Sequence, residues 1–183
     1  AKVTLPPTLT NIGDYAFYGC ENMGLDVEAT EENPGTDSTV TIMSGVEHIG
    51  NRAFQGCKSL TEIVIPESVS YLGSHAFYKC ISLKSVVING ALDTIREYSF
   101  FNCSALETLV LPDNIKTVEK YAFRGCELVT AINRPNVESI GDYAFSECWS
   151  LTAIIIPNGV MTIGDRAFEN CTKLAAITIP DSV

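Results

Sequence analysis

The sequence predicts an α/β fold of the solenoid type, in which short coils stack on one another and share one core. One observation is a period of about 23 residues, marked by a recurring phenylalanine and by a cysteine three residues after it. Another is a short β-branched run in most periods, such as residues 63–65 and 154–156, which is closed by Pro66 or Pro157. A unit this short cannot bury its own apolar face, so it must pack on its neighbours.

Seven copies of the pattern align into columns of like residues. The phenylalanines are Phe17, Phe54, Phe77, Phe100, Phe123, Phe145 and Phe168, separated by 37, 23, 23, 23, 22 and 23 residues. The cysteines are Cys20, Cys57, Cys80, Cys103, Cys126, Cys148 and Cys171. Aliphatic columns lie five and eight residues before each phenylalanine and mostly six residues after it. We therefore expect one domain over residues 1–183, with each column forming a ladder through the core.

Each repeat predicts a strand, a turn and a short helix. In the repeat that begins at residue 63, the helix is expected over residues 75–80, because Ala76, Cys80 and Leu83 would share one helical face. A polar residue that follows a glycine precedes five of these helices and is typical of an N-cap. These residues are Asp14, Asn51, Ser74, Asp142 and Asp165. Repeats four and five lack the pair, so we expect looser helix starts there.

The columns closely resemble the BspA-like (Treponema-type) leucine-rich repeats of bacterial and protozoan cell-surface proteins. The resemblance covers nearly the whole chain and rests on two motifs, L-x-x-I-x-I-P and V-x-x-I-G-x-x-A-F-x-x-C. Here they are carried by Leu60, Ile63, Ile65, Pro66, Val69, Leu72, Gly73, Ala76, Phe77 and Cys80. The resemblance implies a curved, right-handed leucine-rich-repeat solenoid with a parallel concave sheet and short helices or turns on the convex side. It also implies a location at the cell surface or outside the cell, in adhesion or recognition.

Two departures from the period stand out. An insertion at about residues 24–37 is rich in acidic residues and has no basic one. A calcium site is conceivable there, but the spacing matches no calcium-loop motif, so a solvated acidic hairpin or mobile loop is favoured. The sixth repeat is one residue short, and Arg134 falls in a column that should face inward. We expect a backbone shift that turns Arg134 outward, with a buried and paired arginine as the alternative.

Composition and motifs argue against several functions. The formal net charge of -10 would repel phosphate backbones and anionic lipid, so we expect no nucleic-acid binding. No run of about 18 apolar residues is present, which argues against membrane insertion by this fragment. His48 and His75 occupy non-equivalent positions, and no catalytic triad, phosphate-binding loop or dinucleotide motif is visible. We expect no enzymatic activity and no cofactor or metal.

The seven cysteines are expected to be reduced and buried. Their number is odd and each occupies the same core column, where a free cysteine behaves as a small apolar residue. Titration with a thiol reagent in denaturant should then count all seven. Cysteines one repeat apart do not form the C-x-x-C pattern of a redox or zinc site.

The outward residues of the predicted sheet form the expected binding surface. At the central strand position these candidate ligand-binding residues are Val64, Val87, Val110, Asn133, Ile155 and Thr178. The face they form is short-chained and nearly uncharged, and an apolar stripe of this kind is typical of an interaction surface; ordinary β-propensity is the alternative explanation. Trp149 is a candidate contact residue, with packing on the coil edge equally open. Tyrosines 98, 121 and 143 could stack on sugar or peptide, although packing between coils is favoured.

We therefore expect a non-catalytic recognition or adhesion module. Its partner would be a protein, such as a host-surface or matrix protein, although a glycan also fits. The alternative is an inert structural spacer that presents another domain of a longer parent protein, since the chain begins and ends inside a repeat. Apolar residues at both ends lack obvious caps, so self-association through the repeat ends is expected.

Overall fold

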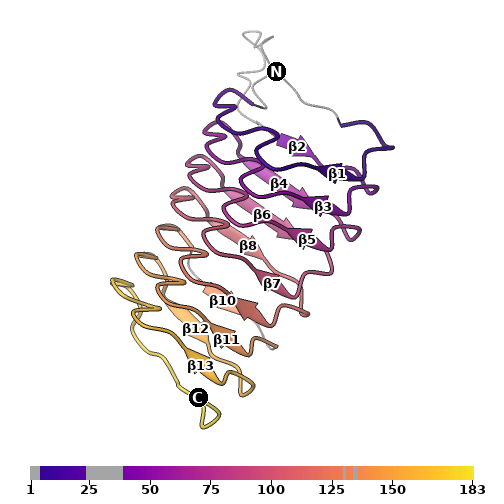
Figure 1. The fold of residues 1–183 in the computed structure, drawn as a ribbon. Coiled ribbons are helices and arrows are strands. Elements are labelled where there is room, and N and C mark those ends of the chain that lie inside the picture. Colours follow the sequence, from indigo (N-terminus) through magenta and orange to yellow (C-terminus); the bar gives the residue numbers. More distant parts are fainter. Residues whose placement is uncertain (1–4, 24–38, 130, 134–135) are drawn as a thin grey trace.

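The structure, a computed structural model, describes residues 5–23, 39–129, 131–133 and 136–183. The coils stack in sequence order, so the first and last described coils lie at opposite ends of the stack (Figure 1). Most coils contain one long and one short strand. The long strands are β2 (Thr39–Thr41), β4 (Glu62–Ile65), β6 (Ser85–Ile88), β8 (Thr108–Val110), β10 (Ala131–Asn133) and β12 (Ala153–Ile155). The short strands are β1 (Asn11–Ile12), β3 (His48–Ile49), β5 (Tyr71–Leu72), β7 (Thr94–Ile95), β9 (Thr117–Val118), β11 (Ser139–Ile140) and β13 (Thr162–Ile163).

Every strand pair is parallel and joins equivalent positions of neighbouring coils. The long strands pair in the order β2-β4-β6-β8, with β10-β12 as a separate pair, and the short strands form β1-β3-β5 and β7-β9-β11-β13. Within the long strands the side chains alternate between core and surface, as in β4, where Ile63 and Ile65 are buried and Glu62 and Val64 are exposed. The period-2 pattern of the sequence therefore sets which face each strand buries.

The predicted columns form the core. The phenylalanine rings of successive coils stack with centroids 5.1–5.6 Å apart and with planes within 18° of parallel. Six of the cysteine thiols are buried beside them, and each Sγ donates to the backbone carbonyl of the phenylalanine one coil earlier, at 3.1–3.4 Å. Stacking of identical coils therefore satisfies apolar and polar groups at the same time.

The predicted short helices are wrong: the described residues contain no helix. The segment around each phenylalanine is a run of tight turns. In all seven coils, the residue two before the phenylalanine and the residue two after it both adopt positive φ, for example His75 at 60° and Lys79 at 58°. A left-handed residue cannot continue a right-handed helix. Backbone amides alternate between the two directions instead: Tyr78 N donates to His75 O within the coil, and Phe77 N donates to Ser99 O in the next coil.

The expected N-caps have a different role. Asp14 Oδ1 accepts from Asn51 N at 2.7 Å, Asn51 Oδ1 accepts from Ser74 N at 3.0 Å, and Asp142 Oδ1 accepts from the backbone amide of residue 165 at 2.8 Å. The side chains therefore link neighbouring coils instead of capping a helix within one. Four of the preceding glycines are needed for this close approach, since a Cβ on Gly73, for example, would lie 2.5 Å from Asn51 N, whereas a Cβ on Gly13 in the first coil would meet nothing within 4 Å.

Repeats four and five, which lack the glycine and its polar neighbour, use another contact. Glu119 Oε2 accepts from Glu97 N at 2.8 Å, and Lys120 Nζ pairs with the carboxylate of Glu97 at 3.3 Å. The short-strand ladder is interrupted just before these coils, between β5 and β7. The glutamate side chain reaches across from the opposite neighbour and supplies the acceptor that an aspartate or asparagine supplies elsewhere.

The long-strand ladder is interrupted between β8 and β10, next to the coil that is one residue short. A small apolar cavity of about 20 Å³ lies there, lined by Leu111 and Ile156 among others. In the sequence repeat, Arg134 occupies the same position as Leu111 and Ile156. Arg134 lies outside the described residues, so its expected outward turn stays a prediction. The acidic insertion also falls almost wholly outside the described residues.

Candidate functional site

The long-strand face holds a row of apolar side chains at its centre. Val64 pairs in register with Val87 and Val87 with Val110, so their side chains lie side by side on three successive strands. Val64 and Val110 are 50 % and 45 % exposed, and Val87 between them is half-buried. Thr41 extends the row by one strand. With strands about 4.8 Å apart, the row from β2 to β8 is about 14 Å long.

A polar row runs beside the apolar one. Glu62, Ser85 and Thr108 stand in register two residues before the three valines. The described side chains of the four strands include no lysine or arginine. A partner would therefore meet an apolar centre with small polar groups on one side, which is the usual arrangement of a protein interface.

The remaining residues predicted for this face are distributed differently. Asn133 pairs with Ile155 in the separate β10-β12 sheet, where Ile155 is 65 % exposed. Thr178 is exposed but lies in no strand. Trp149 is 46 % exposed in the turn that follows a buried cysteine. Ile81 occupies the equivalent position in another coil and is also exposed. The structure therefore unites three of the six predicted face residues in one row.

The tyrosine column pairs with itself. Tyr98 and Tyr121 stack at 4.7 Å with their planes 12° apart, Tyr121 and Tyr143 stack at 4.9 Å and 8°, and His75 covers the other side of Tyr98 at 4.7 Å. Because the faces of these rings are covered by the next ring, this column is packing between coils and not a free stacking platform.

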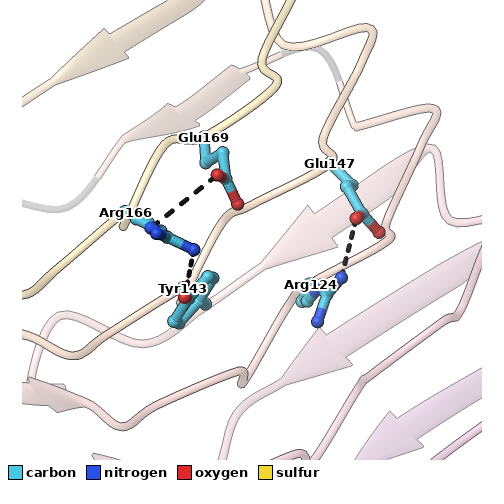
Figure 2. A network of polar contacts seen from close by, with 5 residues as sticks. All are labelled: Arg124, Tyr143, Glu147, Arg166 and Glu169. Atoms are coloured by element: carbon cyan, nitrogen blue, oxygen red, sulfur yellow. Dashed lines mark hydrogen bonds and ion pairs between the residues drawn. The ribbon is translucent and has the colours of Figure 1, made fainter.

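Charged side chains close the column near the C-terminal coils, as Figure 2 shows. Arg124 donates to Glu147 at 2.7 Å and lies 5.8–5.9 Å from the centres of two tyrosine rings, and Arg166 donates to the hydroxyl of Tyr143 at 2.8 Å. The hydrogen bond to Glu147 raises the pKa of Arg124. The groups are paired with one another and hold neighbouring coils together, so the cluster has no free nucleophile or base for catalysis.

His75 and the cysteines are the other titratable groups with a bearing on chemistry. His75 is half-buried, and burial together with nearby Arg52 lowers its pKa. All seven cysteines are free, but Cys20 is exposed, because the described part of the first coil leaves its thiol uncovered. No group of three or more His, Cys, Asp or Glu side chains is arranged for a metal within the described ranges. The described residues also contain no helix long and apolar enough to cross a membrane.

One surface hollow was missed by sequence reasoning. It measures about 300 Å³, and two tyrosines, Tyr18 and Tyr78, line it together with Gln55. The signal was present in the column one residue after the phenylalanines, where Gln55 interrupts a series of rings. Two other hollows, of about 490 and 290 Å³, have no aromatic lining.

The repeats of this chain match a known family of leucine-rich repeats. The family model of the BspA type leucine rich repeat region matches in six copies, over residues 1–31, 36–148 and 119–183. The chain belongs to this family. The expected leucine-rich-repeat solenoid of stacked parallel strands is therefore confirmed, and only its helices are corrected.

Solved structures show the same fold. A leucine-rich repeat protein of T. pallidum aligns with a TM-score of 0.82 and 29 % identity, over 94 % of this chain and 77 % of that chain. One from Eubacterium ventriosum aligns with a TM-score of 0.80 and 26 % identity, over 100 % of this chain and 45 % of that chain. The pneumococcal vaccine antigen PcpA aligns at 0.51 and 22 % identity, over 96 % and 57 % of the two chains, which shows the fold alone. No curated protein is detectably similar in sequence.

Proposed function

We propose that this chain is a cell-surface recognition module that binds a protein partner through the apolar row of its long-strand face and catalyses no reaction. The observation that carries the proposal is the in-register row Val64, Val87 and Val110, exposed on a paired sheet that cannot collapse to hide it. The chain belongs to the BspA-type family, and its resemblance to the BspA-like repeats of cell-surface proteins supports the proposed location.

The row sets the chemistry of the partner. A row of about 14 Å, made of Thr41 and the three valines, is too short for a whole interface, since stable interfaces bury roughly 1,600 Å² in total. The row therefore forms the desolvated centre, where a few residues carry most of the binding energy. The net charge of -10 favours a neutral or basic partner surface around it.

A pair of charges in the row tests the proposal. Val87→Arg with Val110→Arg places two guanidinium groups where the partner would exclude water, so adhesion should fall at least tenfold. Adhesion is measured with fluorescent beads that carry the purified chain, on decellularised extracellular matrix and on cultured epithelial cells. A matched control, Thr117→Arg with Thr162→Arg on the short-strand face, should adhere like the wild type.

Thermal unfolding of both variants checks that the fold is kept. Adhesion that survives the change at Val87 and Val110, with the fold intact, would contradict the proposal. The spacer function would be favoured if the wild-type chain itself does not adhere, because an inert surface binds neither matrix nor cells.

A further inference from the structure

We propose that the hollow between Tyr18 and Tyr78 is a second binding site, which seats one neutral sugar ring of a glycan. The site lies on the turn segments of the first three coils, away from the long-strand face. It is independent of the protein-binding row, and either could fail without the other.

The hollow exists because one ring is missing from a stack. The column one residue after the phenylalanines holds Tyr18, Gln55, Tyr78 and Phe101 in successive coils. Tyr78 and Phe101 stack with centroids 4.9 Å apart and planes 6° from parallel. No ring follows Tyr78 in the other direction, since the coil on that side carries Gln55. Two coil spacings of about 4.8 Å leave roughly 10 Å between the rings of Tyr18 and Tyr78.

That gap suits one ring-shaped ligand. Carbon atoms in contact lie roughly 3.5–4.0 Å apart, so a ring between the two tyrosines takes up roughly 7–8 Å. The wall is open at the backbone as well, because Gly19 and Gly56 carry no side chain where the later coils have Lys79 or Asn102. A Cβ on Gly56 would meet only the backbone of Gly19, at 3.7 Å. The hollow of about 300 Å³ is at the lower end of ligand pockets, which span about 300–1,000 Å³.

The polar groups around the gap favour a sugar over an aromatic ring. Glu21 and Lys58 pair at 2.6 Å beside the hollow, and both are more than half exposed. The side-chain oxygen of Gln55 is buried and has no hydrogen-bond donor among the described residues. After a small rotation of the Gln55 side chain, a ligand hydroxyl would reach this amide, supply the missing donor and relieve the cost of the unpaired group. The C–H faces of a pyranose are attracted by the negative faces of the tyrosine rings, while its hydroxyl groups reach the polar groups around them.

The charge around the hollow narrows the class of sugar that it can bind. Glu21 and Lys58 balance one another, so the walls carry little net charge beyond Lys79, whose amino group already lies 5.3 Å from the Tyr78 ring centre. The molecule as a whole carries -10, which disfavours sialylated or sulfated sugars. The site therefore fits a neutral hexose or N-acetylhexosamine.

Saturation-transfer difference NMR on the 183-residue chain tests the site. The probes are the methyl glycosides of glucose, galactose, mannose and N-acetylglucosamine, with N-acetyltyrosinamide as the aromatic competitor. At least one glycoside should bind with a Kd of roughly millimolar, as expected for a single ring, and should shift tyrosine ring signals. The variant Gln55→Tyr fills the gap with the ring that neighbouring coils carry, so it should keep or raise the melting temperature and weaken glycoside binding at least tenfold.

A second variant guards against an unexpected effect of filling the gap. Tyr18→Ala removes one wall at a residue that is 54 % exposed, so the fold should be kept and binding should fall at least fivefold. Val87→Arg with Val110→Arg should bind the glycosides like the wild type, which separates this site from the protein-binding row. The proposal is overturned if no glycoside binds, if Gln55→Tyr binds as tightly as the wild type, or if only N-acetyltyrosinamide binds.

Discussion

The buried cysteine of a coil fills space in the core and donates a hydrogen bond to the neighbouring coil. Cys103 is fully buried beside the phenylalanine ladder, and its Sγ donates at 3.2 Å to the backbone oxygen of Phe77 one coil earlier. Alanine would fill less space and leave that oxygen with one donor fewer, and serine would bury a more polar group. Burial raises the pKa of Cys103 from 9.0 to about 12, and that of Cys57 to about 12 as well. These buried thiols are therefore inert in the folded chain.

The raised thiol pKa values predict loss of stability in alkali. In the unfolded chain a thiol ionises near pH 9, but in the fold it holds its proton until about pH 12. Between those values the folded state binds more protons, so stability is complete below about pH 9 and falls as pH rises, by about 1.4 kcal/mol per pH unit for each such thiol. Urea unfolding from pH 8 to 10.5 should show this slope.

Substitution separates the thiols from other alkaline effects. Cys103→Ala with Cys126→Ala should lower the stability at pH 8 and reduce its pH slope by up to two protons. An unchanged slope in the double variant would contradict burial as the origin of the effect.

At the scale of one element, the turn segment around each phenylalanine is stabilised by contacts between coils against its own backbone preference. Residues other than glycine rarely adopt positive φ, at a cost of about 1–2 kcal/mol each. Lys79 adopts 58°, while Gly56 and Gly125 occupy the equivalent position in other coils at 74°. Hydrogen bonds between coils offset this strain, because amides such as Phe77 N then reach carbonyls of the next coil. An isolated peptide of this segment should not keep the shape.

The left-handed position predicts opposite effects for two substitutions. Gly56→Ala has room, with Gly19 Cα at 3.7 Å, so it should cost about 1 kcal/mol from backbone strain alone. Lys79→Gly should gain about 0.5 kcal/mol, because relief of strain exceeds the added freedom of the unfolded chain. Urea unfolding measures both. A destabilised Lys79→Gly protein with a neutral Gly56→Ala would show that strain at this position is unimportant.

Across the whole molecule, stability is expected to depend on where along the stack a residue lies. Phe100 stacks on Phe77 and Phe123 at 5.4 and 5.3 Å and is fully buried, whereas Phe168 in the last coil has one ring neighbour at 5.6 Å and is half-buried. In a solenoid each coil gains stability only from its neighbours, so an interior coil loses two interfaces where a terminal coil loses one.

This position dependence predicts unequal costs for one chemical change. Phe100→Ala should cost about 3–5 kcal/mol, the range for a buried aromatic, and Phe168→Ala less than half of that. Hydrogen exchange should also show that Phe168→Ala affects only the final coils, while Phe100→Ala weakens the coils on both sides. Equal costs, or a purely local effect at Phe100, would contradict the additive account of the stack.

The sequence alone determined the core. Phenylalanine, cysteine and aliphatic residues that recur about every 23 residues can be buried efficiently only if successive coils stack. The alternation within residues 62–65 decided which face of the strand is exposed. The row of Val64, Val87 and Val110 could be predicted for the same reason. Thr178 is exposed as the alternation predicts, but it lies in no strand, because the sequence of one coil does not show whether its backbone pairs with the next.

The tertiary structure decided the turns and the hollow. The spacing Ala76, Cys80 and Leu83 indicates a helix when one coil is considered alone, because local sequence shows apolar period but not hydrogen-bond partners. In the stack, the next coil offers its carbonyls at every second residue, and the backbone takes left-handed turns to use them. The gap at Gln55 likewise has meaning only between the tyrosines of two other coils, because a missing ring becomes a site only where its neighbours hold the space open.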